Sequence, residues 1–130
     1  MKRDMDLIRE LMLKLESLPM RPGGIVLIKG DAEELQVDGC SVDQIDYHLA
    51  LIREAGLIET PGNGPIGGGF PFRRLTWSGH DFLDSVRSPD VWDKTKKVAS
   101  AAGGFTVDLL VFAAKSYLEN KIKGLLGGQG

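Results

Sequence analysis

The residue types that most often carry catalysis stand together at one place in this sequence, Ser78-Gly79-His80-Asp81. Serine, histidine and aspartate serve as nucleophile, base and orienting group in many hydrolases. Neighbours on one helical turn cannot hydrogen-bond one another in that order, so we interpret the segment as a helix start. Ser78 is the predicted N-cap, and Asp81 completes a variant capping box. No other grouping in the sequence fits the geometric roles of an active site, and we expect a non-enzymatic protein.

The sequence offers little that could hold a metal or a cofactor. Cys40 is the single cysteine, and neither His48 nor His80 has the HxxxH, HExxH or cysteine partner that zinc sites use. The glycine-rich stretch 64–69 lacks both GxxxxGK[ST] and GxGxxG between a strand and a helix, which favours a hairpin tip over a phosphate-binding loop. We therefore expect no cofactor, no metal ion and no small-molecule substrate.

Arginine and aromatic residues follow the glycine-rich loop, and three interpretations of them stay open. Phe70, Arg73 and Arg74 stand beside Phe72. The guanidinium groups could contact phosphates or a minor groove of DNA. The same residue types are enriched at the hot spots of protein–protein interfaces. In the third interpretation Phe72 belongs to the core and both arginines face solvent.

Charge is distributed unevenly along the chain. Residues 1–60 carry 7 Lys/Arg against 12 Asp/Glu, whereas residues 61–130 carry 9 against 6, for a net charge of −2. In the basic half, Lys94, Lys96 and Lys97 could add to an electrostatic footprint or form a solvated helix face. The chain has no uniformly basic region of the kind that predicts nucleic-acid binding.

The helix expected at 42–55 presents acidic residues on its exposed side. These residues and their aromatic neighbour are Asp43, Asp46, Tyr47 and Glu54. Affinity for DNA depends mainly on Lys and Arg that neutralise phosphate, and Arg53 is the one base of this helix. Such a face suits a protein partner better than a DNA duplex.

Helix caps, hydrophobic periodicity and Gly/Pro positions predict the elements that carry these residues. Helices are expected at 4–18, 41–55, 78–87, 89–101 and 107–126, and strands at 25–28, 57–60 and 72–76. Residues 60–72 should form the tip of an irregular hairpin. The stretch 31–39 could form either one helical turn or a second short strand.

This order of elements resembles a winged helix. HLALIREAGLIE, residues 48–59, resembles the end of the third helix running into the first wing strand, and RLTWSGHDFL, residues 74–83, resembles the second wing strand running into the next helix. We expect an α+β fold with a winged-helix-like domain at 1–87, a helical C-terminal extension at 88–126 and a disordered tail at 127–130. An ordinary DNA-binding winged helix has two helices before the wing. Here the first of that pair looks missing or degenerate.

Nearly the whole chain resembles one family of small phage and prophage proteins, a domain of unknown function. The resemblance lies in MKRDMDLIRELMLKLE, DGCSVDQIDYHLALIREAGLIE and LTWSGHDFLDSVRSPDVWDKTKK. It implies a mobile-element origin and supplies no activity. Our leading hypothesis is a protein-interaction module that acts on a host or phage machine. The alternative is a DNA-binding transcriptional regulator that contacts phosphates through its basic wing.

The last expected helix has an apolar stripe wider than a solitary surface helix needs. Leu110, Ala114, Leu118 and Ile122 lie on this stripe. It packs either across its own domain or against a second copy, and we expect a homodimer, because exposed apolar patches usually mark interfaces.

Two features of the sequence argue against a membrane or secreted protein. The N-terminus has no apolar segment of the kind found in signal peptides. The longest apolar run, 109–114, is far shorter than the roughly 20 residues of a membrane span. We expect a cytoplasmic protein without a membrane partner.

Overall fold

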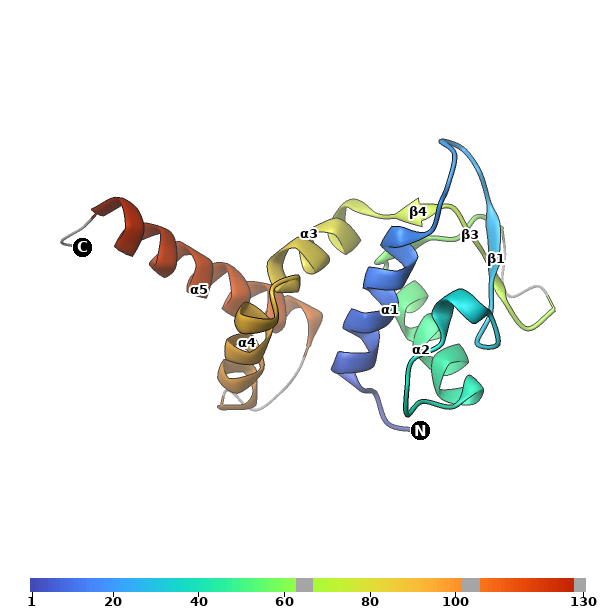
Figure 1. The fold of residues 1–130 in the computed structure, drawn as a ribbon, viewed down its shortest axis with the longest axis horizontal. Helices are drawn as coiled ribbons and strands as arrows, with labels where there is room; N and C mark the ends of the chain where they lie inside the picture. Colours follow the sequence, from blue (N-terminus) through green and yellow to red (C-terminus); the bar gives the residue numbers. More distant parts are fainter. Residues whose placement is uncertain (63–66, 102–105, 128–130) are drawn as a thin grey trace. The chain divides into compact units, whose positions relative to one another are not determined.

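A computed structural model shows an α+β fold (Figure 1) and describes residues 1–62, 67–101 and 106–127. These residues form five α-helices and two small antiparallel sheets. The chain folds as two compact units, Met1–His80 and Asp81–Gly130. The domain limits expected at 87/88 and 126/127 stay predictions. Of the expected tail, residue 127 ends the last helix, and residues 128–130 lie outside the described part of the chain.

Two capped helices build the first unit. In α1 (Met5–Ser17), the Asp4 carboxylate accepts the N–H groups of Asp6 and Leu7, as a helix N-cap does. In α2 (Val42–Glu54), Ser41 and Gln44 form a reciprocal capping box. Gly56 follows α2 with φ +73°, a left-handed conformation that glycine adopts without strain. Both helices lie within two residues of their expected bounds.

A buried histidine joins these two helices. His48 is 1% exposed, and its Nε2 accepts the N–H of Asp4 at 2.8 Å. Its Nδ1 lies 2.7 Å from the carbonyl oxygen of Gln44, which fixes the neutral tautomer with the proton on Nδ1. The hydrogen bond to His48 thereby connects Asp4, the residue just before α1, to the middle of α2.

The strands of the first unit are short. Strand β1 (Val26–Ile28) pairs with β3 (Phe70–Phe72), and β2 (Ile58–Glu59) pairs with β4 (Arg74–Leu75), both antiparallel. The expected pairing across the hairpin is therefore confirmed, although the hairpin residues 63–66 lie outside the described part of the chain. The returning strand differs from its prediction: it divides at Arg73, so that its first half joins β1 and its second half joins β2.

The ambiguous stretch 31–39 contains one 3₁₀ turn, η1 (Glu33–Leu35), in place of a second strand. Leu35 anchors this turn in the core with 1% of its surface exposed. The core of the unit is formed by aliphatic and aromatic side chains from α1, α2 and the strands, including Leu11, Met12, Leu15, Ile45, Leu49, Ile52, Leu57 and Phe72.

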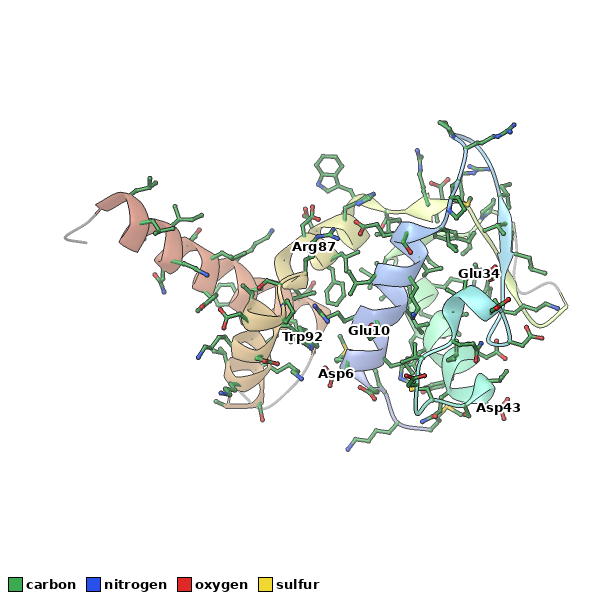
Figure 2. All side chains as sticks on the ribbon, in the orientation of Figure 1. Asp6, Glu10, Glu34, Asp43, Arg87 and Trp92 are labelled. Carbon is green, nitrogen blue, oxygen red and sulfur yellow. The ribbon has the colours of Figure 1, made fainter. Side chains whose placement is uncertain are left out.

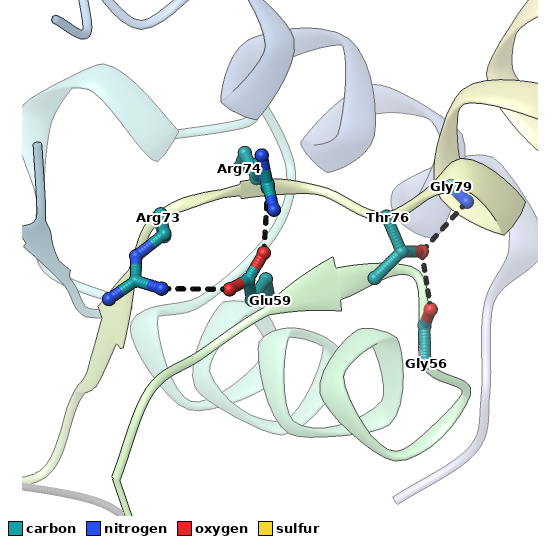
Figure 3. Close-up of polar contacts among 6 residues, drawn as sticks. All are labelled: Gly56, Glu59, Arg73, Arg74, Thr76 and Gly79. Atoms are coloured by element: carbon teal, nitrogen blue, oxygen red, sulfur yellow. Dashed lines mark hydrogen bonds and ion pairs between the residues drawn. The ribbon is translucent and has the colours of Figure 1, made fainter. Parts of the chain in front are cut away.

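Helix α3 (Trp77–Val86) begins one residue earlier than expected, because another residue caps it. The Oγ1 of Thr76 accepts the N–H of Gly79 at 3.0 Å and donates to the carbonyl of Gly56 at 2.5 Å (Figure 3). The prediction that Ser78 is the N-cap is wrong. Thr76 is favoured because the strand leading into the helix holds its hydroxyl against the turn after α2.

The second unit is a helical pair. Helix α4 (Pro89–Ala101) packs along α5 (Val107–Gly127) and buries Trp92 and Thr95 on its inner side. Tyr117 of α5 donates a hydrogen bond to Asp90 of α4 at 3.1 Å. Ser88 and Thr106 cap the two helices: each hydroxyl oxygen accepts the backbone N–H three residues on, that of Val91 and that of Leu109.

Candidate functional site

The two arginines of the hairpin are both bound by one carboxylate. Glu59 of β2 accepts Nη1 of Arg73 at 2.9 Å and Nε of Arg74 at 2.7 Å (Figure 3). The backbone N–H of Arg73 also donates to the carbonyl of Glu59 at 2.9 Å. The antiparallel pairing of β2 with β4 places these three residues together, since Arg74 lies opposite Glu59 in the register.

The two ion pairs of Glu59, with Arg73 and with Arg74, form what we call the Glu59 clamp, and they change the charge of the hairpin. The hydrogen bond from Arg74 is the main reason that the pKa of Glu59 is lowered, and Arg73 adds to the effect against partial desolvation. A carboxylate that stays ionised cancels one of the two positive charges. Arg74 keeps a side chain 71% exposed, whereas that of Arg73 is 36% exposed.

The neighbouring base and aromatic residue are also occupied within the unit. Arg53 of α2 donates from Nε to the Thr60 hydroxyl at 2.9 Å. Its guanidinium carbon lies 5.2 Å from the centre of the Phe70 ring, a cation–π distance. Phe70 is therefore half-buried, with its ring against Arg53. Phe72 lies in the core, as the third of the interpretations given above expects for this residue.

The acidic face of α2 is partly a surface and partly structural. Asp43 points outward from the start of the helix (Figure 2), and Glu54 and Tyr47 are exposed. Asp46 is different: it is half-buried and accepts the backbone N–H of Gly30 at 2.5 Å. It joins the end of β1 to α2, so three of the four residues expected on this face are exposed.

The lysine run belongs to the second unit. Lys94 and Lys97 are exposed on α4. Lys96 is half-buried, and its ammonium group lies 5.5 Å from the centre of the Trp92 ring.

The stripe expected to form a dimer interface is largely internal at its first half. Leu110 and Ala114 have no exposed surface, and they lie on the helix that packs along α4. They therefore offer no surface to a partner in this conformation. Leu118 is half-buried and Ile122 is exposed, followed by the exposed Leu125 and Leu126. The homodimer itself stays a prediction.

An aliphatic segment of the first unit is exposed that was not predicted from the sequence. Ile25, Val26 and Leu27 are 53%, 39% and 45% exposed, although they form or adjoin strand β1. The available signal was a run of four apolar residues in a strand too short to be covered on both faces. Trp77 is a second case, 85% exposed at the first residue of α3.

Two other features are absent from the described residues. Across 1–62, 67–101 and 106–127, no three His, Cys, Asp or Glu side chains gather into a group that could hold a metal ion. No helix in the same part of the chain has the length and apolarity that crossing a membrane requires.

Comparison with known proteins shows the family of this chain. Residues 2–105 match the family model described as "Hypothetical protein (DUF2513)". The chain belongs to this family. The DUF2513 chain is also 33% identical over 127 residues to an uncharacterized protein of Haemophilus influenzae, a match that covers 97% of this chain and 99% of the relative. No solved structure matches it significantly. The expected membership of an uncharacterised family is confirmed.

Proposed function

We propose that this DUF2513 protein is a winged-helix-like, non-enzymatic module of phage or prophage origin that binds another protein in the cytoplasm. The observation that carries the proposal is the clamp at Glu59. It occupies both arginines on which a nucleic-acid-binding wing would depend. The partner would belong to a host or phage machine.

The order and pairing of the strands support the winged-helix-like part of the proposal. A hairpin of β2 and β4 follows α2, the position of a wing after a third helix. Strand β1, which follows α1, joins the returning strand through β3. The place of the helix that would steady a recognition helix is taken by the single turn η1. An ordinary DNA-binding winged helix uses that pair of helices to hold one of them in the major groove.

Charge supports a protein partner over DNA. The first unit contains nine Lys/Arg against twelve Asp/Glu. Its recognition-helix equivalent, α2, exposes Asp43 and Glu54, and its single base, Arg53, is held by Thr60 and Phe70. Phosphate repels such a face, whereas a basic or polar protein surface complements it.

One observation favours the second candidate, a DNA-binding regulator. Arg74 remains 71% exposed, and Lys94 and Lys97 are exposed on α4. Contacts of this kind are made to phosphates, so binding would have little sequence preference and a steep salt dependence.

The experiment compares both ligands on the same protein. Tagged full-length protein is used to capture partners from phage-infected bacterial cells, with nuclease treatment as a control. The wild type and the double variant Asp43→Lys with Glu54→Lys are run side by side. We expect a stoichiometric protein partner that survives nuclease and is lost with the double variant.

A fluorescence anisotropy titration with a labelled duplex at low salt tests the other candidate. We expect no saturable binding by the wild type. Binding that weakens linearly with the logarithm of salt and disappears in Arg73→Ala with Arg74→Ala would establish the DNA-binding regulator instead.

A further inference from the structure

We infer that the open edge of strand β1, together with the apolar groove beside it, binds an extended segment of a partner protein as an added β-strand. This inference rests on the proposed protein-binding function and adds a second contact with the same partner, beside the one made by the acidic face of α2. The partner segment would carry aliphatic side chains at alternate positions and Lys or Arg beside them.

The pairing of β1 with β3 leaves one edge of β1 open. Leu27 lies opposite Pro71, which has no N–H, so these two residues form a non-hydrogen-bonded pair. The hydrogen-bonded pairs are then Val26 with Phe72 and Ile28 with Phe70. In an antiparallel ladder the N–H and C=O of the residue between two such pairs point to the other edge. Within the described part of the chain, the backbone groups of Leu27 have no partner at that edge.

A groove runs beside this edge. It measures about 260 Å³, slightly below the 300–1,000 Å³ typical of small-molecule sites, and suits side chains better than a cofactor. Its walls come from the segment after α1, from β1 and from η1, and include Leu18, Met20, Val26, Leu27, Glu34 and Leu35.

The shortness of η1 is the reason that the groove is open. Three residues of 3₁₀ helix bury one large side chain, Leu35, and leave Val26 and Leu27 uncovered. A free strand edge with exposed aliphatic side chains is a surface that soluble proteins usually protect with charge, proline or a covering segment. Addition of a partner strand satisfies the Leu27 backbone and buries the aliphatic surface in one step.

Exposed carboxylates near the groove indicate which charge a partner segment should carry. Asp31, Glu33 and Glu34 follow β1, and all three are exposed. Glu34 lies beside β1 at the wall of the groove (Figure 2). Within the described residues, none of the three carboxylates forms an ion pair. The aliphatic part of the Lys29 side chain, just after β1, lies beside Gly69, which precedes β3. A basic segment therefore complements this rim.

The test begins with a randomised peptide library panned on immobilised full-length protein. We expect enriched peptides that alternate aliphatic residues and contain Lys or Arg. Their affinity should fall about tenfold or more in Leu27→Lys and in Glu33→Lys with Glu34→Lys. Trp77→Lys is the matched control, because it replaces an apolar residue that is even more exposed, 85% against 45% for Leu27, but lies outside the groove. It should leave affinity unchanged. Thermal unfolding of each variant shows that its fold is intact.

A second measurement on the wild type does not depend on any variant. On saturation with an enriched peptide, exchange of the Leu27 amide proton should slow, since this N–H gains an acceptor only if a strand is added. Peptides that bind the Leu27 and Glu33/Glu34 variants as well as the wild type, or no change at the Leu27 amide, would overturn the inference. A panned library without enrichment would overturn it as well.

The two proposals fail separately. If cellular capture yields a protein partner that the Leu27→Lys variant retains, the β1 site is wrong and the protein-binding function stands. If capture yields none and the wild type binds duplex DNA, the proposed function fails.

Discussion

At the scale of single residues, the side chains with the most apparent chemistry are used to hold the first unit together. Glu59 binds Arg73 and Arg74, and His48 joins the N-terminus to α2. The hydroxyl of Thr76 both caps α3 and reaches the turn after α2. Each of these contacts can be tested by one substitution.

The Glu59 clamp predicts a dependence of stability on pH. Because the arginines lower the pKa of Glu59 in the folded state, the clamp stabilises fully at pH above the unfolded value of 4.5. The stabilisation disappears as the pH falls through the lowered folded-state pKa. We expect Glu59→Gln to reduce the Tm at pH 7 and to match the wild type under strongly acidic conditions. Glu54→Gln, which alters an exposed carboxylate of α2, should show no such convergence.

The cap at Thr76 predicts a difference between two neighbouring hydroxyl residues. Thr76→Val removes the acceptor for the Gly79 N–H and the donor to Gly56, and should cost about 1–2 kcal/mol of unfolding free energy. Ser78→Ala removes only an exposed hydroxyl and should change stability by less than about 0.5 kcal/mol. Urea titration monitored by circular dichroism measures both. Equal losses would mean that Ser78 is the cap after all.

At the scale of elements, close backbone approaches decide how helices and strands meet. Gly79 in the first turns of α3 lies against the carbonyl of Leu57 at the start of β2, where an added Cβ would overlap that oxygen. Gly30 plays the same part between β1 and α2, with the carbonyl of Val42 and the Asp46 carboxylate at the position of a Cβ. These two glycines allow the backbone of a short strand to approach the backbone of a helix closely.

Substitution of Gly79 by alanine should therefore destabilise the first unit. We expect a loss of roughly 1–3 kcal/mol, the range for overpacking, because Leu57 is buried and cannot move away freely. Gly124→Ala is the matched control: apart from its chain neighbours and the backbone of its own helix, nothing described lies within 4 Å of the position of an added Cβ. Alanine in a helix interior gains about 0.5–1 kcal/mol over glycine. Calorimetric unfolding of both variants gives the comparison, and a neutral Gly79→Ala would contradict the observed approach.

At the scale of the whole molecule, the two units differ in how completely they cover their apolar residues. Helix α4 covers the first half of α5, where Leu110, Ala113 and Ala114 are buried. The second half keeps Ile122, Leu125 and Leu126 52%, 78% and 82% exposed. A homodimer built on the expected stripe of α5 would therefore rely mainly on this second half.

Self-association is thus predicted to depend on the end of α5. Light scattering should give the mass of a dimer for the wild type and of a folded monomer for Ile122→Glu with Leu125→Glu, because symmetric copies bury such apolar ends. Leu110→Glu, in contrast, should unfold the helical pair, since it places a charge at a fully buried position. A wild type that is monomeric at high micromolar concentration would exclude the dimer.

The sequence by itself determined the helices and most of their ends, because caps such as Ser41 and breaks such as Gly56 act within a few residues. It also determined that Ile58 and Glu59 pair across a hairpin, since the glycine-rich loop permits little else. The tertiary structure alone decided that Glu59 holds both arginines of the hairpin, that Thr76 replaces Ser78 as the cap, and that Leu110 is internal. These outcomes depend on which distant side chains meet. Strand register and helix packing determine which side chains meet. Neither can be recognised from the residue types at those positions alone.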